Sequence, residues 1–185
     1  ATFTFSFVWR RKSWKDGRVS IKVERNYLEI NSIKDLKTSK FPSDDCYIDF
    51  SDPADFQINK FFYKNIGKEH RWTDRLFWTD KQWIEYISDQ KVKTYILKKA
   101  NDMAGYFELI FHEEKKETEI AYLGLLKEYQ NKKLGSFLLT SAIKNSFIDN
   151  TNRVWVHTCS LDHKHALNNY ISRGMRIYKT ESVSI

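Results

Sequence analysis

Apolar and polar residues alternate in six short segments of the chain, the pattern expected of half-buried β-strands. The segments are Val19–Ile30, Thr94–Lys99, Ala104–Phe111, Glu117–Leu126, Arg153–Thr158 and Met175–Thr180. Asn101 and Asp102 are turn-forming residues, so we expect them to join the second and third strands as a hairpin.

Four other segments carry apolar residues at helical spacing. They are Phe56–Ile66, Thr79–Ile87, Leu134–Ile148 and Lys164–Arg173. We expect Gly67 and Gly174 to end the first and last of these helices, and Thr79 or Asp80 to cap the second. The order of strands and helices predicts an α+β fold with mixed α/β layers.

The polar segment Ser32–Asp55 separates the first strand from the first helix and contains both prolines, so it is expected to be a long loop. The chain has 185 residues, of which 41% are hydrophobic, and it shows no internal repeat. This length and composition predict one domain over residues 1–185, with a short N-terminal extension.

The cysteines and the N-terminus indicate a reducing compartment. Cys46 and Cys159 form no C-x-x-C pair or disulfide framework. The apolar run Phe3–Trp9 precedes its basic residues and is too short for a signal sequence or a membrane helix. We therefore expect a cytoplasmic protein with no membrane partner.

The net charge of +7 and the pI of about 9.2 raise the question of nucleic-acid binding. Basic residues are spread from Arg10 to Lys179 and interleaved with 24 acidic residues, which disfavours a nucleic-acid partner. A modest basic excess also suits an enzyme whose cofactor carries phosphates.

The strand EIAYLGLL runs through KEYQNKKLGS into a helix, which places unpaired backbone N–H groups at the helix N-terminus. Such a turn attracts anions. This segment resembles the GNAT N-acetyltransferase superfamily, whose signature after the fourth strand is Q/R-x-x-G-x-G/A. The matching residues are Gln130, Asn131, Lys132, Lys133, Leu134, Gly135 and Ser136. Lys133 stands where the first signature glycine is usual.

The segment VWVHTCSLDHKHALNNYISRGMRIY resembles the C-terminal motif of the same superfamily, with Ala166, Tyr170, Gly174 and Met175 in register. DRLFWTDKQW and AGYFEL resemble a bacterial subgroup whose substrate is unassigned, so the resemblance covers nearly the whole chain. It implies a central mixed sheet of six to seven strands flanked by about four helices.

The resemblance also implies acetyl-CoA as co-substrate. Its pyrophosphate would bind the N–H groups from Asn131 to Ser136, with His163 as a further contact where many relatives have Asn. Its pantetheine arm would pair with Leu123, Gly124 and Leu125, with a strand bulge at Gly124 and the Leu123 N–H as the donor to the thioester carbonyl.

The same resemblance assigns two catalytic roles. Tyr170 matches the tyrosine that protonates the departing thiolate. Glu119 matches a catalytic glutamate that deprotonates the acceptor amine, with Glu108 or a chain of waters as alternatives. The acetyl group would pass by direct attack in a ternary complex to a primary amine that the sequence does not identify.

Other interpretations compete with the enzyme. The basic, aromatic-rich chain permits a module that stacks on single-stranded nucleic acid, although we expect most of its aromatic residues to be core. These residues are Phe61, Phe62, Trp72, Trp78 and Trp83. Lys133 in place of glycine permits an acyl-CoA-binding protein without turnover, but we expect an ordinary negative φ there and a lysine ammonium that reaches the phosphates.

No metal is expected. His157, Cys159, Asp162, His163 and His165 lie close in sequence, but their spacing differs from the common structural zinc sites. We expect His157 to be satisfied by neighbouring side chains on its strand. For the assembly, the sequence leaves a monomer or a homodimer open.

Overall fold

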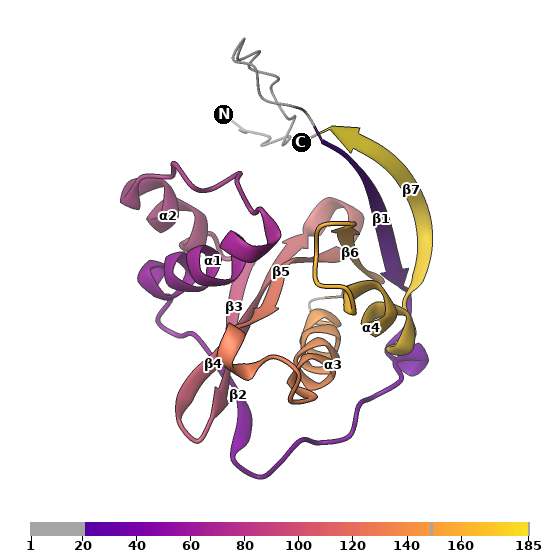
Figure 1. Cartoon of the computed structure of the whole chain (residues 1–185), viewed down its shortest axis with the longest axis horizontal. Helices are drawn as coiled ribbons and strands as arrows, with labels where there is room; N and C mark the ends of the chain where they lie inside the picture. The colour runs from indigo at the N-terminus through magenta and orange to yellow at the C-terminus, as the bar shows by residue number, and fades with distance from the viewer. Residues whose placement is uncertain (1–20, 149, 185) are drawn as a thin grey trace.

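The structure, a computed structural model, describes residues 21–148 and 150–184, so the predicted features of Phe3–Trp9 lie outside the described residues. Its centre is a seven-stranded mixed sheet in the order β2-β3-β4-β5-β6-β1-β7 (Figure 1). The strands are β1 (Lys22–Ile30), β2 (Cys46–Phe50), β3 (Val92–Lys99), β4 (Asp102–His112), β5 (Glu117–Leu125), β6 (Arg153–Cys159) and β7 (Arg176–Ser184).

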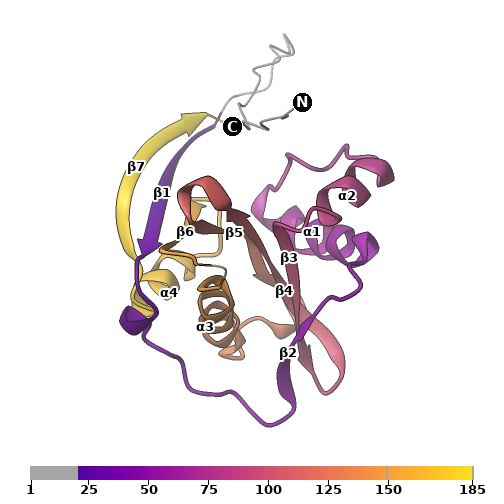
Figure 2. The same ribbon diagram turned by 180° about the vertical axis from the view of Figure 1, so that it is seen from behind.

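Helices cover both faces of the sheet. They are α1 (Phe56–His70), α2 (Asp80–Ile87), α3 (Leu134–Ser146) and α4 (Ala166–Ser172), with short 3-10 turns at Ile33–Asp35, Glu113–Lys115 and Lys127–Tyr129. Figures 1 and 2 show α1 and α2 together on one side and α3 and α4 on the other. This arrangement confirms the predicted mixed α/β fold.

The alternation of side chains along β3 and β4 produces the two layers. Ile96 and Tyr106 pack with Phe62 of α1 in one apolar cluster. Their sequence neighbours Leu97 and Phe107 belong to the larger cluster that packs against α3 and α4. Each strand of the hairpin therefore supplies both cores.

The strand connections place the first and last described strands side by side. β3, β4 and β5 form an antiparallel meander, and β5 then pairs with β6 in parallel. The first strand, β1, lies between β6 and β7 and is antiparallel to both. The N-terminal strand is thus an interior strand of the sheet.

The predicted loop Ser32–Asp55 is wrong in its second half, because β2 lies within it and pairs with β3 at the edge of the sheet. Cys46 is buried, but Tyr47 and Phe50 are exposed. β2 is an edge strand of five residues in which only Cys46 is buried, so it shows too little alternation to be detected among its polar neighbours.

One helix end and one turn differ from the predictions. α1 continues past Gly67 to His70, and its C-cap is Arg71, which adopts the left-handed conformation with φ 53°. Thr79 caps α2 as predicted, in a capping box with Gln82. The β3–β4 turn is formed by Ala100 and Asn101, both with positive φ, rather than by Asn101 and Asp102.

Gly174 follows α4 at φ 98°, as its predicted position at the helix end requires. A Cβ there would lie 2.2 Å from the Asp35 carbonyl oxygen, so the segment after β1 packs directly on this turn. Over residues 21–148 and 150–184, no helix combines the length and the apolar character needed to span a bilayer.

Candidate functional site

The sheet opens between β5 and β6. The two strands pair only where Glu117–Glu119 meets Arg153–Trp155. From there to Leu125, β5 pairs with β4 on one side and has no strand on the other. The ladder between β4 and β5 shifts register at Ala121, the extra residue between Ile120 and Tyr122. The bulge expected at Gly124 therefore lies at Ala121, just beyond the last pair with β6.

The free edge of β5 presents backbone groups to this gap. Leu126 donates its N–H to the Ala104 carbonyl of β4 at 2.9 Å. Because successive residues of an antiparallel strand direct their backbone groups to opposite sides, Leu123 and Leu125 direct theirs away from β4, into the gap. The Leu125 carbonyl accepts a hydrogen bond from Gln130 Nε2 at 3.5 Å, consistent with this direction.

Gly124 lies in the part of β5 that borders the gap, but its regular pairing with Tyr106 shows no bulge there. A Cβ on Gly124 would lie 2.7 Å from Cγ2 of Ile66 on α1. The glycine therefore lets α1 pack closely over β5, beside the point where the strands separate.

The turn before α3 exposes a row of backbone donors. Within the part of the chain that the structure describes, none of the N–H groups of residues 131–136 donates a hydrogen bond, and no side chain caps the helix. Asn131 and Lys133 both adopt the left-handed conformation, with φ 59° and 61°. Concave rows of N–H groups at a helix N-terminus bind anions.

The expectation of a negative φ at Lys133 is wrong. The backbone retains the conformation for which glycine is favoured, although a lysine occupies the position. Lys132 and Lys133 are exposed on this turn, so two ammonium groups stand next to the unpaired donors.

α4 packs beside this turn. Asn169 Nδ2 donates to the Gly135 carbonyl at 3.1 Å. The next residue, Tyr170, is buried, and its hydroxyl makes no hydrogen bond to another described residue. Burial and the nearby Asp162 carboxylate raise the pKa of Tyr170, which keeps the phenol protonated at neutral pH.

The loop between β6 and α4 carries the predicted cofactor contact His163. Its Nδ1 accepts the His165 N–H at 3.3 Å, and burial followed by the adjacent His165 lowers its pKa. Asp162 turns back to its own strand, accepting from Thr158 Oγ1 at 2.6 Å and the Cys159 N–H at 2.9 Å. His157 lies on β6 against the Tyr27 ring.

These side chains do not converge. Among the side chains placed in residues 21–148 and 150–184, no group of three or more His, Cys, Asp or Glu is arranged to hold a metal ion.

Glu119 lies on β5 at the last pair with β6. Its side chain is 19% exposed, and its Oε2 forms a hydrogen bond with His112 Nε2 at 2.9 Å. The His112 ring stacks near Trp155 of β6, with centroids 6.2 Å apart. Sequence reasoning missed His112, although its period-two spacing from Glu108 places both on one face of β4.

Glu108, the rival to Glu119, is buried in a polar cluster beneath α1 and α2. It is fully inaccessible to solvent and accepts from Asn59 Nδ2 at 2.7 Å, Arg75 Nη1 at 2.9 Å and the Tyr86 hydroxyl at 2.8 Å. A carboxylate enclosed by three donors cannot meet a substrate in this arrangement. Its role is to anchor the segment between α1 and α2 to the sheet.

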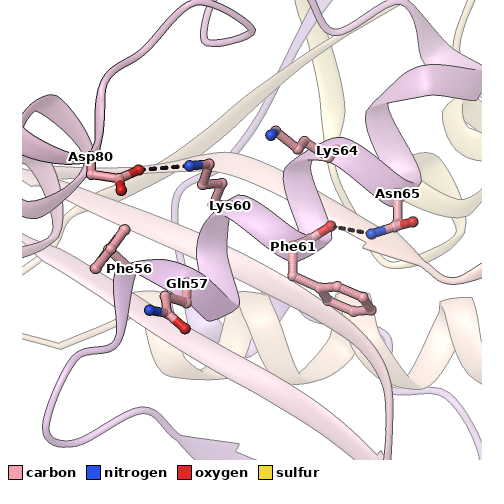
Figure 3. Close-up of a pocket in the computed structure, with 7 residues that line it drawn as sticks. All are labelled: Phe56, Gln57, Lys60, Phe61, Lys64, Asn65 and Asp80. Carbon is pink, nitrogen blue, oxygen red and sulfur yellow. Dashed lines mark hydrogen bonds and ion pairs between the residues drawn. The ribbon is translucent and has the colours of Figure 1, made fainter.

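The aromatic residues of this region are divided between core and surface. Phe62 and Trp83 are fully buried, Trp72 and Trp78 are half-buried, and Phe61 is exposed. Figure 3 shows Phe61 among the residues of α1 that line a hollow, where Lys60 and Asp80 form an ion pair at 2.6 Å. None of the predicted site residues lines this hollow.

The sequence model of the acetyltransferase (GNAT) family matches residues 56–175. The chain belongs to the GNAT family. The matched range begins with α1 and ends after α4, so it includes the gap, the turn before α3 and Tyr170. No curated protein sequence gives a significant match.

Solved GNAT structures share the fold at low sequence identity. A GCN5-related N-acetyltransferase from Sphaerobacter thermophilus is 10% identical, with a TM-score of 0.68 over 88% of this chain and 50% of that one. One from Kribbella flavida is 15% identical, with a TM-score of 0.61 over 87% and 56%. The chain thus spans about half the length of these relatives.

A spermidine N-acetyltransferase from Vibrio cholerae, solved in complex with CoA and spermine, is 17% identical, with a TM-score of 0.58 over 71% of this chain and 81% of that one.

GNAT proteins use acetyl-CoA, and the residues of this chain fit that ligand. The N–H groups of residues 131–136, which have no hydrogen-bond acceptor among the described residues, suit a pyrophosphate. The free edge of β5 suits the amide-containing pantetheine arm. The fit rests on backbone groups, so the departure at Lys133 leaves it intact.

Proposed function

We propose that this chain is an acetyl-CoA-dependent N-acetyltransferase that acetylates a primary amine by direct attack in a ternary complex. The observation that carries the proposal is the gap between β5 and β6, which leads to the unpaired N–H groups before α3. Without a ligand, such an opening would leave strand-edge and helix-end donors without protein partners.

Each end of the gap has a role in holding the ligand. The residues proposed to contact it are Leu123, Gly124, Leu125, Gln130, Asn131, Lys132, Lys133, Leu134, Gly135, Ser136 and His163. When bound, acetyl-CoA supplies an acetyl group activated as a thioester. The Leu123 N–H, directed into the gap, stabilises negative charge that develops on the acetyl oxygen.

Two side chains carry the proton transfers. Glu119 takes the proton from the acceptor amine, and His112 holds the glutamate in position through their 2.9 Å hydrogen bond. Tyr170, kept protonated by burial, donates a proton to the departing thiolate. Glu108 is not proposed as the base, because its carboxylate is enclosed by Asn59, Arg75 and Tyr86.

The setting of the enzyme is part of the proposal. Cys46 and Cys159 are both free thiols, which favours a reducing compartment such as the cytoplasm. We expect a monomer or a homodimer, which sedimentation equilibrium distinguishes.

Binding and turnover test the proposal separately. Protein shown by mass spectrometry to be free of CoA should be stabilised by acetyl-CoA, by about 2.7 kcal/mol at a ligand concentration a hundredfold above Kd. A panel of primary amines should then release thiol from acetyl-CoA. Absence of any thermal shift at millimolar acetyl-CoA would refute the proposal.

A shift without thiol release from any amine would instead favour an acyl-CoA-binding protein without turnover. Single-stranded RNA, assayed in parallel at physiological salt, should give no comparable shift.

A further inference from the structure

Asp74 is a surface carboxylate that hydrogen-bonds to two phenols, the buried Tyr63 and the half-buried Tyr122. Its Oδ1 accepts from the Tyr63 hydroxyl at 3.0 Å and its Oδ2 from the Tyr122 hydroxyl at 2.5 Å. The side chain is nevertheless 44% exposed. Each carboxylate oxygen has two acceptor sites, so both oxygens can still accept from a ligand.

The charged groups beneath Asp74 do not neutralise its negative charge. Arg75 is the cation of this cluster, and its guanidinium pairs with Glu108 at 2.9 Å but lies 3.9 Å from Asp74. One positive charge, that of Arg75, therefore faces two carboxylates. The closer of the two is the buried Glu108. The net charge of these three groups is −1, and Asp74 is the member that solvent reaches.

Asp74 borders the gap between β5 and β6. Its partner Tyr122 lies on β5 beyond the last residue that pairs with β6. Glu119 pairs with Trp155 of β6, and His157 lies two residues further along the same face of β6, where the two strands have separated. Three elements thus bring Asp74, Glu119 and His157 around the same space.

Aromatic rings form the wall next to Asp74. The Trp72 and Tyr122 rings meet edge to face with centroids 4.8 Å apart, and Tyr63 lies 5.4 Å from Tyr122. Trp72 and Tyr122 are both half-buried. An exposed carboxylate beside half-buried aromatic residues is an arrangement that binds ammonium groups, by charge and by cation–π attraction.

We propose that Asp74 binds a second positively charged group of the acceptor, so that the preferred substrates are diamines or polyamines rather than monoamines. This inference rests on the proposed acetyltransferase function. The nitrogen that attacks must be neutral and lies at Glu119, whereas the second ammonium stays charged and pairs with Asp74. Two separated carboxylates thus serve two nitrogens of one molecule.

The test compares binding of α,ω-diaminoalkanes with three to eight carbons and n-alkylamines of equal length. Titrations with CoA present, followed by calorimetry and Trp fluorescence, report binding without turnover. In the wild type, at least one diamine should bind about tenfold or more tighter than its matched monoamine. If no diamine is favoured over its monoamine, the inference is overturned.

Asp74→Asn should abolish this preference, because it keeps the shape and removes the charge. Asp49→Asn, on the exposed edge strand β2, removes one equal charge away from the gap and should retain the preference. If Asp74→Asn unfolds, Tyr122→Phe, which removes the hydroxyl at Oδ2, should reduce the preference several-fold. A preference that survives in a folded Asp74→Asn protein would also overturn the inference.

Acetyl-CoA binding and thiol release, measured in the same samples, distinguish failure of the proposed function from failure of the role proposed for Asp74. Wild-type protein that binds acetyl-CoA and acetylates monoamines and diamines equally would retain the proposed function and lose the role of Asp74. Failure to bind acetyl-CoA would refute the proposed function itself.

Discussion

The guanidinium of Arg75 lies 2.9 Å from the carboxylate of Glu108, and both side chains are almost completely buried. The guanidinium also lies 4.0 Å from the Tyr86 ring centroid and 4.3 Å from that of Tyr122. This contact attaches the segment between α1 and α2 to β4. It therefore supports the side of the gap on which Asp74 lies.

Breaking this ion pair should strongly destabilise the fold. Arg75→Met leaves the Glu108 carboxylate buried without its cation, and we expect a loss of about 3–5 kcal/mol in urea unfolding. Lys60→Met breaks the surface pair with Asp80 and should cost at most about 1 kcal/mol. Equal effects of the two variants would contradict the assignment of Arg75 as the anchor.

Lys133→Gly should stabilise the protein. A left-handed backbone disfavours a residue with a Cβ by about 1–2 kcal/mol, which exceeds the entropic cost of glycine, so a net gain of about 0.5–1 kcal/mol is expected. Lys132→Gly is the matched control, because Lys132 does not have a positive φ. It should leave stability unchanged or lower it.

Acetyl-CoA affinity of the same variants reports the lysine charge. Lys133→Ala and Lys133→Gly both remove one ammonium, so each should weaken binding by about tenfold or less at low salt, with a smaller loss at high salt. Tighter binding by Lys133→Gly than by wild type would show that the lysine hinders the ligand.

Gly124→Ala should disturb the contact between α1 and β5. Its Cβ would lie 2.7 Å from Ile66 Cγ2, and we expect a destabilisation of about 1–3 kcal/mol. Ile66→Ala alone should cost about 2–5 kcal/mol by leaving a cavity. The double variant should be destabilised by less than the sum of the two single variants, because the methyl group added by Gly124→Ala occupies space that Ile66→Ala leaves empty.

Turnover should separate the two proposed catalytic residues from ligand binding. Tyr170→Phe and Glu119→Gln should each lower kcat by about 100-fold or more while the Kd of acetyl-CoA, measured by calorimetry, changes little. Full activity in Tyr170→Phe would mean that the thiolate obtains its proton elsewhere. Full activity in Glu119→Gln would favour a water chain as the base.

The pKa of His157 should lie below its ordinary value of 6.5, because burial and then Arg25 disfavour the imidazolium. NMR titration should show that Arg25→Gln raises this pKa and that Asp74→Asn lowers it further. The unfolded chain binds this proton more readily than the folded one, so the stability contribution is complete above pH 6.5 and declines as the pH falls toward the folded pKa.

Much of the fold followed from local pattern. The period of the apolar residues identified β3, β4 and β5 as strands and α3 as a helix, because side chains return to the same face every two residues in a strand and about every 3.6 residues in a helix. The edge strand β2 was missed because only one end of it is buried. The turn before α3 was located because two chemical features, a strand and a helix start, adjoin in the sequence.

The chemistry of the site divides along the same line. The sequence by itself located the turn before α3, whose backbone N–H groups we propose to bind the pyrophosphate, and Tyr170 after it, since local spacing and motif register record these positions. Only the tertiary structure decided that Glu108 is enclosed by Arg75 while Glu119 meets His112, and that Asp74 borders the gap. Two carboxylates on neighbouring strands look alike in sequence, and their accessibility depends on which distant side chains fold over them.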